Sequence, residues 1–119
     1  MHEGAEMANP FEELVTLDRV IHEPARLAVL TALGGCRCAD FAFLQKLIGL
    51  TSGNASRHLA KLVDAGLVEV EKSFERRMPR TTYRLTPTGR KAVQRYWQQL
   101  DRAQKAGADL RTVVAAARG

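Results

Sequence analysis

The chain has 119 residues, 45% of them hydrophobic and 26% charged, which fits one folded domain with a single core. No apolar run approaches the roughly 18 residues of a membrane span, and residues 1–8, expected to be a disordered tail, lack the apolar stretch of a secretory signal, so we expect a cytoplasmic protein without a membrane partner. The net charge is +5, and the excess lies between residues 52 and 95, where there are ten cations and four anions, so nucleic acid is the favoured partner.

Two helices are predicted in the first third of the chain. The first begins with Asn9 as N-cap and Pro10 at the first helical position, and Glu12 completes a capping box. The buried stripe of this helix is expected to comprise Leu14, Leu17, Val20 and Ile21. The second helix begins at residues 23–24, ends at residues 34–35 and is expected to be largely buried.

A helix-turn-helix is predicted in the middle of the chain. Its first helix begins near residues 39–40 and ends at Gly49. The buried stripe expected for this helix is Phe41, Leu44, Leu47 and Ile48. A turn of about three residues leads into a helix over residues 52–65, with Thr51 or Ser52 as N-cap.

The helix over residues 52–65, which is ended by Gly66, has two different faces. The apolar face, expected to be buried, carries Ala55, Leu59, Leu62 and Val63. The opposite face carries small residues, an amide and charges, namely Gly53, Asn54, Arg57, Ala60, Lys61 and Asp64. Little bulk together with hydrogen-bonding groups and cations suits a helix that enters the major groove of DNA. The same pattern, taken alone, also fits the solvated face of an ordinary amphipathic helix.

A β-hairpin with a charged tip is predicted next. Residues 67–72 alternate, with Val68 and Val70 expected to face inward, and residues 81–85 alternate again. The loop expected between them, residues 73–80, carries Arg76, Arg77 and Arg80. Three arginines beside a helix-turn-helix favour contact with phosphates or the minor groove. The alternative is that these charges only protect an edge hairpin from pairing.

A long last helix is predicted over residues 87–119, with Thr86 as N-cap and Pro87 at the first position. Its track of apolar and small residues recurs every three or four positions, as in a coiled coil: Val93, Tyr96, Leu100, Ala103, Gly107, Leu110, Val114 and Ala117. Since no other segment remains to cover this track, we predict a homodimer; the alternative is a helix folded back on its own domain. The predicted interface comprises Leu14, Leu17, Val93, Tyr96, Trp97, Leu100, Ala103, Leu110 and Val114.

Three stretches resemble bacterial winged helix-turn-helix transcriptional regulators of the ArsR/MarR type. They are HEPARLAVLTAL (residues 22–33), LTSGNASRHLAKLVDAGLVEVEKSF (50–74) and RRMPRTTYRLTPTGRKA (76–92). The resemblance implies a mainly α fold with a β-hairpin (α+β), divided into a DNA-binding domain over residues 9–86 and a dimerisation helix over 87–119. It also implies a repressor that binds double-stranded DNA through Ser52, Asn54, Ser56, Arg57, Lys61, Arg76, Arg77 and Arg80. Thr51 and Lys72 complete the predicted DNA-binding residues.

Two cysteines, Cys36 and Cys38, precede the third helix, where ArsR-type metal sensors carry a Cys-x-Cys pair that captures soft metals. The flanking Gly-Gly and Ala-Asp depart from that pattern, and further ligands would have to come from a partner chain or from His22, His58 or Asp40. Arg37 between the thiols could lower a thiol pKa. A metal- or thiol-responsive repressor is therefore one alternative, and small semi-buried residues are the other.

No catalytic constellation is legible in the sequence, so we expect neither an enzyme nor a cofactor. His58 is expected to pack or to contact a phosphate rather than to bind a metal. A winged-helix module that docks protein rather than DNA is a further alternative, against which the basic segment argues. The sequence leaves room for a small-molecule effector but does not identify one.

Overall fold

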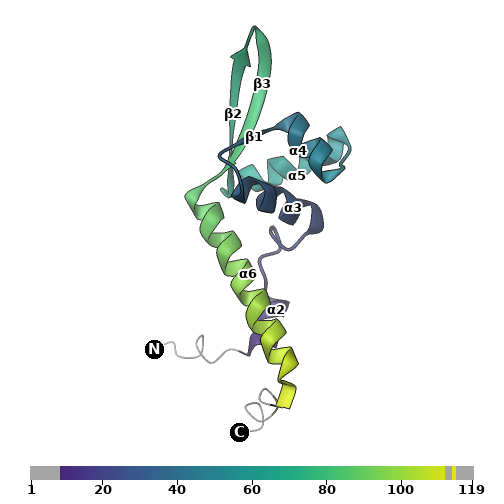
Figure 1. The fold of residues 1–119 in the computed structure, drawn as a ribbon, viewed down its shortest axis with the longest axis vertical. Coiled ribbons are helices and arrows are strands. Elements are labelled where there is room, and N and C mark those ends of the chain that lie inside the picture. The colour runs from purple at the N-terminus through teal and green to yellow at the C-terminus, as the bar shows by residue number, and fades with distance from the viewer. Residues whose placement is uncertain (1–8, 112–113, 115–119) are drawn as a thin grey trace.

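The computed structural model describes residues 9–111 and residue 114. The elements in chain order are α2 (Pro10–Val15), α3 (Pro24–Gly34), β1 (Ala39–Asp40), α4 (Phe41–Ile48), α5 (Ser52–Asp64), β2 (Val68–Glu75), β3 (Met78–Leu85) and α6 (Pro87–Ala108). Helices α3, α4 and α5 form a small bundle, from which the β2–β3 hairpin projects at one end and α6 at the other (Figure 1). This arrangement confirms the predicted α+β fold.

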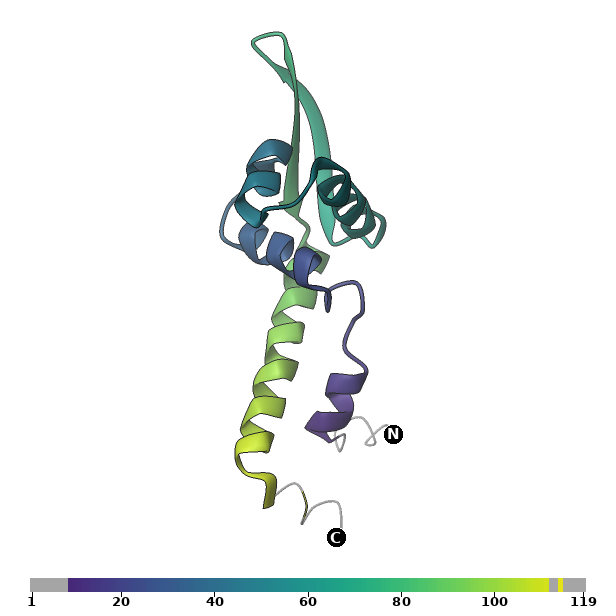
Figure 2. The ribbon, with the colours of Figure 1, turned by 90° about the vertical axis from the view of Figure 1, so that its right-hand side faces the viewer.

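The molecule is elongated, measuring 66 × 32 × 21 Å with a radius of gyration of 18.1 Å. A compact chain of this length would have a radius of about 13–14 Å. The excess length comes from the hairpin, called the wing below, and from an arm in which α2 lies beside the distal half of α6 (Figure 2). Both therefore extend beyond the central core.

The helix starts follow the predicted caps. Asn9 and Glu12 form the capping box of α2, and the side chain of Thr86 accepts a hydrogen bond from the N–H of Gly89 at the start of α6. Asp40 caps α4, and Thr51 caps α5 through its hydroxyl, which accepts from the N–H of Asn54 at 3.1 Å. A short polar side chain at each of these positions satisfies an orphan N–H of the first turn, which is why the starts are legible in the sequence.

The predicted helix-turn-helix is confirmed. Gly49 ends α4 in the left-handed conformation, with φ at 77°, and Gly66 takes the same φ just after α5. The buried core joins the three central helices to the base of the wing and to α6, and its fully buried members are Ile21, Val29, Leu30, Leu33, Leu44, Leu59, Leu62 and Val68. The described residues include no helix long and apolar enough to cross a membrane.

The sheet has the strand order β1-β3-β2, with both pairings antiparallel. The prediction of an eight-residue loop over residues 73–80 is wrong. Strand β2 continues to Glu75 and β3 begins at Met78, so only Arg76 and Arg77 form the turn. The prediction that Val70 faces inward is also wrong: it is 40% exposed, because the wing extends beyond the core that covers Val68.

Two predictions for the shorter helices need correction. Helix α2 stops at Val15, so the expected stripe residues Leu17, Val20 and Ile21 lie in the turn that follows it. In this turn the Asp18 carboxylate accepts a hydrogen bond from the N–H of Val20. Local side-chain bonding of this kind competes with a helix. Leu47 is exposed on α4 rather than buried.

The helix predicted over residues 87–119 ends as α6 at Ala108, where Gly107 and Asp109 are weak helix formers. Leu110 and Val114 therefore lie past its end. Ala117 and the predicted tail, residues 1–8, lie outside the described residues.

Candidate nucleic-acid interface

The exposed face of α5 carries a preorganised arginine. The Nη2 of Arg57 donates to the Oδ1 of Asn54 at 2.9 Å, and both side chains are exposed. These residues are three positions apart, so they lie on adjacent turns of one face. Gly53 leaves this face open, since a Cβ placed there would meet nothing within 4 Å. The predicted DNA contacts Thr51, Ser52, Ser56 and Lys61 are also exposed.

The opposite face of α5 is braced against the start of α3 by His58, which is only 7% exposed. Its Nδ1 lies 3.2 Å from Nη1 of Arg26, and its Nε2 lies 3.9 Å from a carboxylate oxygen of Glu23. Because an arginine can only donate, Nδ1 accepts and Nε2 carries the proton. His58 therefore packs within the protein, which is one of the two roles expected from the sequence.

The same network acts on Glu23, whose side chain accepts from the N–H of Arg26 at 2.8 Å. Burial raises the pKa of Glu23, but that hydrogen bond and the positive charge of Arg26 outweigh burial and hold the pKa below its ordinary value. The orientation of α5 thus depends partly on a carboxylate that is ionised at neutral pH.

The wing tip is a two-residue turn in which both residues have positive φ, 53° for Arg76 and 68° for Arg77. Turns of this kind favour Asn-Gly, because a Cβ is crowded in the left-handed region. This turn instead contains two arginines, which are unfavourable at positive φ. Within the described residues neither arginine has an ion-pair partner, so the tip presents two unneutralised charges.

The two faces of the wing differ in charge. The alternation that starts from buried Val68, where β2 packs on α5, puts Lys72 and Phe74 on one face, called the α5 face below. No acidic residue of β2 or β3 lies on this face. The other face carries Glu69, Glu71 and Glu75 together with Arg80 and Arg84.

The arginines of the acidic face are neutralised. Arg80 bonds to Glu75 at 2.7 Å and to Asp40 at 3.1 Å, and Arg84 bonds to Glu69 at 3.2 Å. Arg80 was predicted to contact DNA, but its guanidinium instead joins β1, β2 and β3. It is therefore the least available of the predicted wing contacts.

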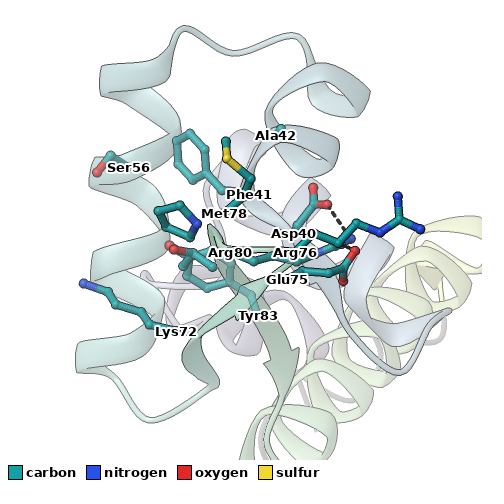
Figure 3. A pocket seen from close by; sticks show the side chains of 12 residues that line it. Asp40, Phe41, Ala42, Ser56, Lys72, Glu75, Arg76, Met78, Arg80 and Tyr83 are labelled. Carbon is teal, nitrogen blue, oxygen red and sulfur yellow. Dashed lines mark hydrogen bonds and ion pairs between the residues drawn. The ribbon is translucent and has the colours of Figure 1, made fainter.

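A groove connects α5 with the wing. It is lined by Ser56 of α5, by Lys72 and Arg76 of the wing and by Phe41 and Ala42 of α4, among others. Ser56 and Lys72 lie on one side of it, and the Asp40–Arg80–Glu75 cluster lies on the other (Figure 3). Predicted contacts from the helix and the wing thus share one surface.

Residues 25–103 match the winged helix DNA-binding domain family. The chain belongs to this family.

Known winged helix proteins agree with the assignment. A transcriptional regulator homologue from Pyrococcus horikoshii OT3 superposes with a TM-score of 0.75 at 30% identity, covering 86% of this chain and 99% of that one. The HTH-type transcriptional regulator YgaV of Escherichia coli K12 is 29% identical over 64% of this chain and 77% of its own length. Apo MarR from E. coli has a TM-score of 0.62 at 21% identity, covering 78% of this chain and 73% of that one, which shows a shared fold. The protein is thus a winged helix DNA-binding transcriptional regulator, and its family and fold are those of transcriptional regulators rather than of enzymes.

The sequence led us to expect that no other segment of the chain covers the heptad track of α6. In the structure, part of this track is covered within the protomer. Leu17, Tyr96 and Ala103 are buried within the protomer, so they offer no surface to a partner. Helix α2 covers part of the track, and Arg102 holds it there through a double hydrogen bond to Glu13, at 3.2 and 3.3 Å. The remaining predicted interface residues are half-buried or exposed: Leu14, Val93, Trp97, Leu100, Leu110 and Val114.

Tyr96 is held by the connection between α2 and α3. Its hydroxyl lies 2.8 Å from Nδ1 of His22, and burial raises its pKa. Beside it, Trp97 is 45% exposed and lines an apolar groove with Leu27 and Leu47. The exposed tryptophan and the groove between α3, α4 and α6 together form an apolar surface patch.

Cys36 and Cys38 are both exposed and unpaired. Among the residues that the structure describes, no three histidine, cysteine or acidic side chains are grouped so that they could hold a metal ion. The Sγ of Cys36 donates to the carbonyl of Ala32 at 3.4 Å, as in an ordinary helix end.

Two features of the site were not predicted. Strand β1 pairs with β3 through Ala39 and Asp40, and a two-residue strand leaves no periodic pattern in the sequence. Gly89 is the other: a Cβ there would lie 2.1 Å from the carbonyl oxygen of Leu67, so only glycine lets α6 seat on the base of the wing. The side chain of Thr86 adds a 2.7 Å hydrogen bond to the carbonyl of Gly66. The Thr-Pro-Thr-Gly sequence signalled the helix start but not this contact.

Proposed function

We propose that the protein is a homodimeric repressor that binds a specific double-stranded DNA sequence, with α5 in the major groove and the wing on the adjoining backbone and minor groove. One observation carries the proposal: unneutralised cations run from Arg57 and Lys61 on α5 to Lys72 on the α5 face of the wing and to its tip. The groove that Ser56 and Arg76 both line connects the two parts. A continuous basic surface of this kind suits the phosphate backbone.

Arg57 is the residue proposed to read sequence. The Oδ1 of Asn54 already fixes its guanidinium, so less side-chain freedom is lost when it donates twice to a guanine. Replacement by alanine should weaken operator binding by about 1–3 kcal/mol and relax the base preference at one position. Arg84→Ala is the matched control, since it removes an arginine from the acidic face of the wing. Equal effects of the two substitutions would contradict the assignment.

The N-terminal end of α5, with Thr51 as N-cap and Ser52 at the first helical position, is proposed to meet a phosphate. Helix N-termini present free N–H groups and a partial positive charge to anions. Lys61, two turns further along, would contact the backbone as a point charge. Lys61→Ala should therefore weaken all sequences alike, in contrast to Arg57→Ala, and a fluorescence anisotropy titration with specific and scrambled duplexes separates the two effects.

Dimerisation is proposed to use exposed apolar side chains of α6 and of the segment that follows it, namely Trp97, Leu110 and Val114. A twofold dimer would place two α5 helices about one turn of DNA apart, ~34 Å. Selection of bound sites from a random DNA pool tests the dimer and the specificity together. We expect a palindrome whose half-sites lie about ten base pairs apart. A single half-site or no enrichment would count against a sequence-reading dimer.

Repression follows if the selected site overlaps a promoter, because a bound dimer would exclude the polymerase. Transcription in vitro from a template carrying the site should fall as protein is added and recover when Arg57→Ala replaces the parent. Increased transcription would assign the opposite sign of regulation.

A further inference from the structure

The wing carries apolar side chains that the core does not use. Phe74 is 77% exposed, more than any other large apolar side chain among the described residues, and Met78 is 66% exposed. Exposed hairpins in soluble proteins are usually protected by charge rather than by aromatic residues. Phe74 also stands two residues before the arginine turn, in the hairpin of β2 and β3 that projects from one end of the molecule (Figure 1). We therefore look for a binding partner that would cover this side chain.

The strand register identifies the side from which that partner approaches. Phe74 lies on the α5 face of the wing with Lys72, and Pro79 stands directly opposite Phe74 on β3. Directly paired residues have Cβ atoms about 5 Å apart, so the two rings form one apolar projection. The charges around it are Lys72, Arg76 and Arg77, whereas the glutamates of the wing face the other way. An apolar projection surrounded by cations complements a polyanion with an apolar interior.

We propose that Phe74, supported by Pro79, is a minor-groove wedge that enters between two base pairs of the operator and bends the duplex. The inference rests on the proposed function, in which the wing follows the minor groove beside α5. Phenylalanine and proline are among the side chains that unstack a base step from the minor groove and kink the duplex toward the major groove. Arg76 and Arg77 would hold the phosphates on either side of the opened step.

The wedge adds a source of specificity that α5 does not supply. Pyrimidine–purine steps such as TA and CA unstack most easily, so the operator should carry one beneath each wing although no side chain hydrogen-bonds to it. The same wedge would kink the duplex toward its major groove, and so away from the inserted wing, at two places, one in each half-site.

The test compares Phe74→Ala with Phe74→Leu, which keeps an apolar wedge. Val70→Ala is the control, because it removes an exposed apolar side chain from the same face nearer the core. Each variant is titrated on a selected operator with 2-aminopurine at the step under the wing, and bend angles are measured by circular permutation gel shift. The parent, Phe74→Leu and Val70→Ala should raise the 2-aminopurine fluorescence and bend the DNA. Phe74→Ala should do neither and should bind about tenfold more weakly.

A mismatch at the same step gives the decisive second measurement. A mismatched step is already partly unstacked, so it should increase the affinity of the parent but leave Phe74→Ala unchanged. If Phe74→Ala binds, bends and unstacks like the parent, the wedge is overturned while DNA recognition by α5 stands. If the alanine variant instead loses the dimer in sedimentation, Phe74 contacts protein and the wedge is again overturned. If the parent selects no DNA at all, the proposed function fails first.

Discussion

The wing tip offers the sharpest test of how this protein balances fold against function. Replacement of Arg76 by Asn and Arg77 by Gly puts into the turn the residue pair that its positive φ angles favour. The left-handed conformation costs an ordinary side chain about 1–2 kcal/mol, and Asn and Gly bear less of that cost. We expect the double variant to be more stable than the parent by about 1–2 kcal/mol in urea denaturation.

The same substitution should damage DNA binding. If each arginine neutralises one phosphate, a dimer loses four phosphate contacts, and the slope of log affinity against log salt should fall by about 3.6. Between about 50 and 200 mM KCl the parent should therefore weaken by an extra factor of roughly 150 relative to the variant. Fluorescence anisotropy at four or five salt concentrations measures the slope for both proteins.

A control pair keeps the charges and the backbone crowding. Arg76→Lys with Arg77→Lys should leave both the stability and the salt slope near the parent values. An Asn-Gly variant with an unchanged slope would show that the tip does not touch phosphates. An Asn-Gly variant that is no more stable would show that the positive φ angles cost nothing in the folded protein.

Three further outcomes are expected. Gly89→Ala should lower the free energy of unfolding by about 1–3 kcal/mol in urea, since its Cβ would strike the backbone of Leu67; an unchanged midpoint would refute the close contact. The depressed pKa of Glu23 contributes stability above its unfolded value of about 4.5 that is lost as pH falls through the lower folded value, so Glu23→Gln should flatten the loss of melting temperature between about pH 5 and 3. Trp97→Ser should shift sedimentation equilibrium toward monomer, whereas Gln98→Ser, a control on the exposed surface of the same helix, should not; equal behaviour would move the dimer face elsewhere.

The helix starts were predictable because their causes are local. Asn9, Asp40, Thr51 and Thr86 each satisfy an N–H two or three residues away, so a short window of sequence contains the whole interaction. The buried face of α5 was predictable for a similar reason, since a period of 3.6 needs no knowledge of the rest of the chain. These features together define the helix-turn-helix.

The arm and the wing were less predictable because their causes lie elsewhere in the chain. The heptad track of α6 indicates that an apolar surface packs on it but does not identify the segment that does so. Helix α2 covers part of the track and is held there by hydrogen bonds between Arg102 and Glu13, which are 89 positions apart in the sequence. The wing turn was missed because arginine is a poor residue for positive φ, so the sequence there reads as a longer loop. Arg80 was predicted as a DNA contact from charge alone, and its partner Asp40 lies 40 residues away.

The close packing of Gly89 on the backbone of Leu67 couples α6 to the base of the wing, so that we expect the two to move together. Helix α6 has 22 residues and so is about 33 Å long. A tilt of about 5° at its distal end, where two arms would meet, displaces the wing end by about 3 Å, close to the 3.4 Å between successive base pairs. A small change in the angle between two arms would therefore displace α5 and the wing of each protomer by about one base pair relative to its half-site.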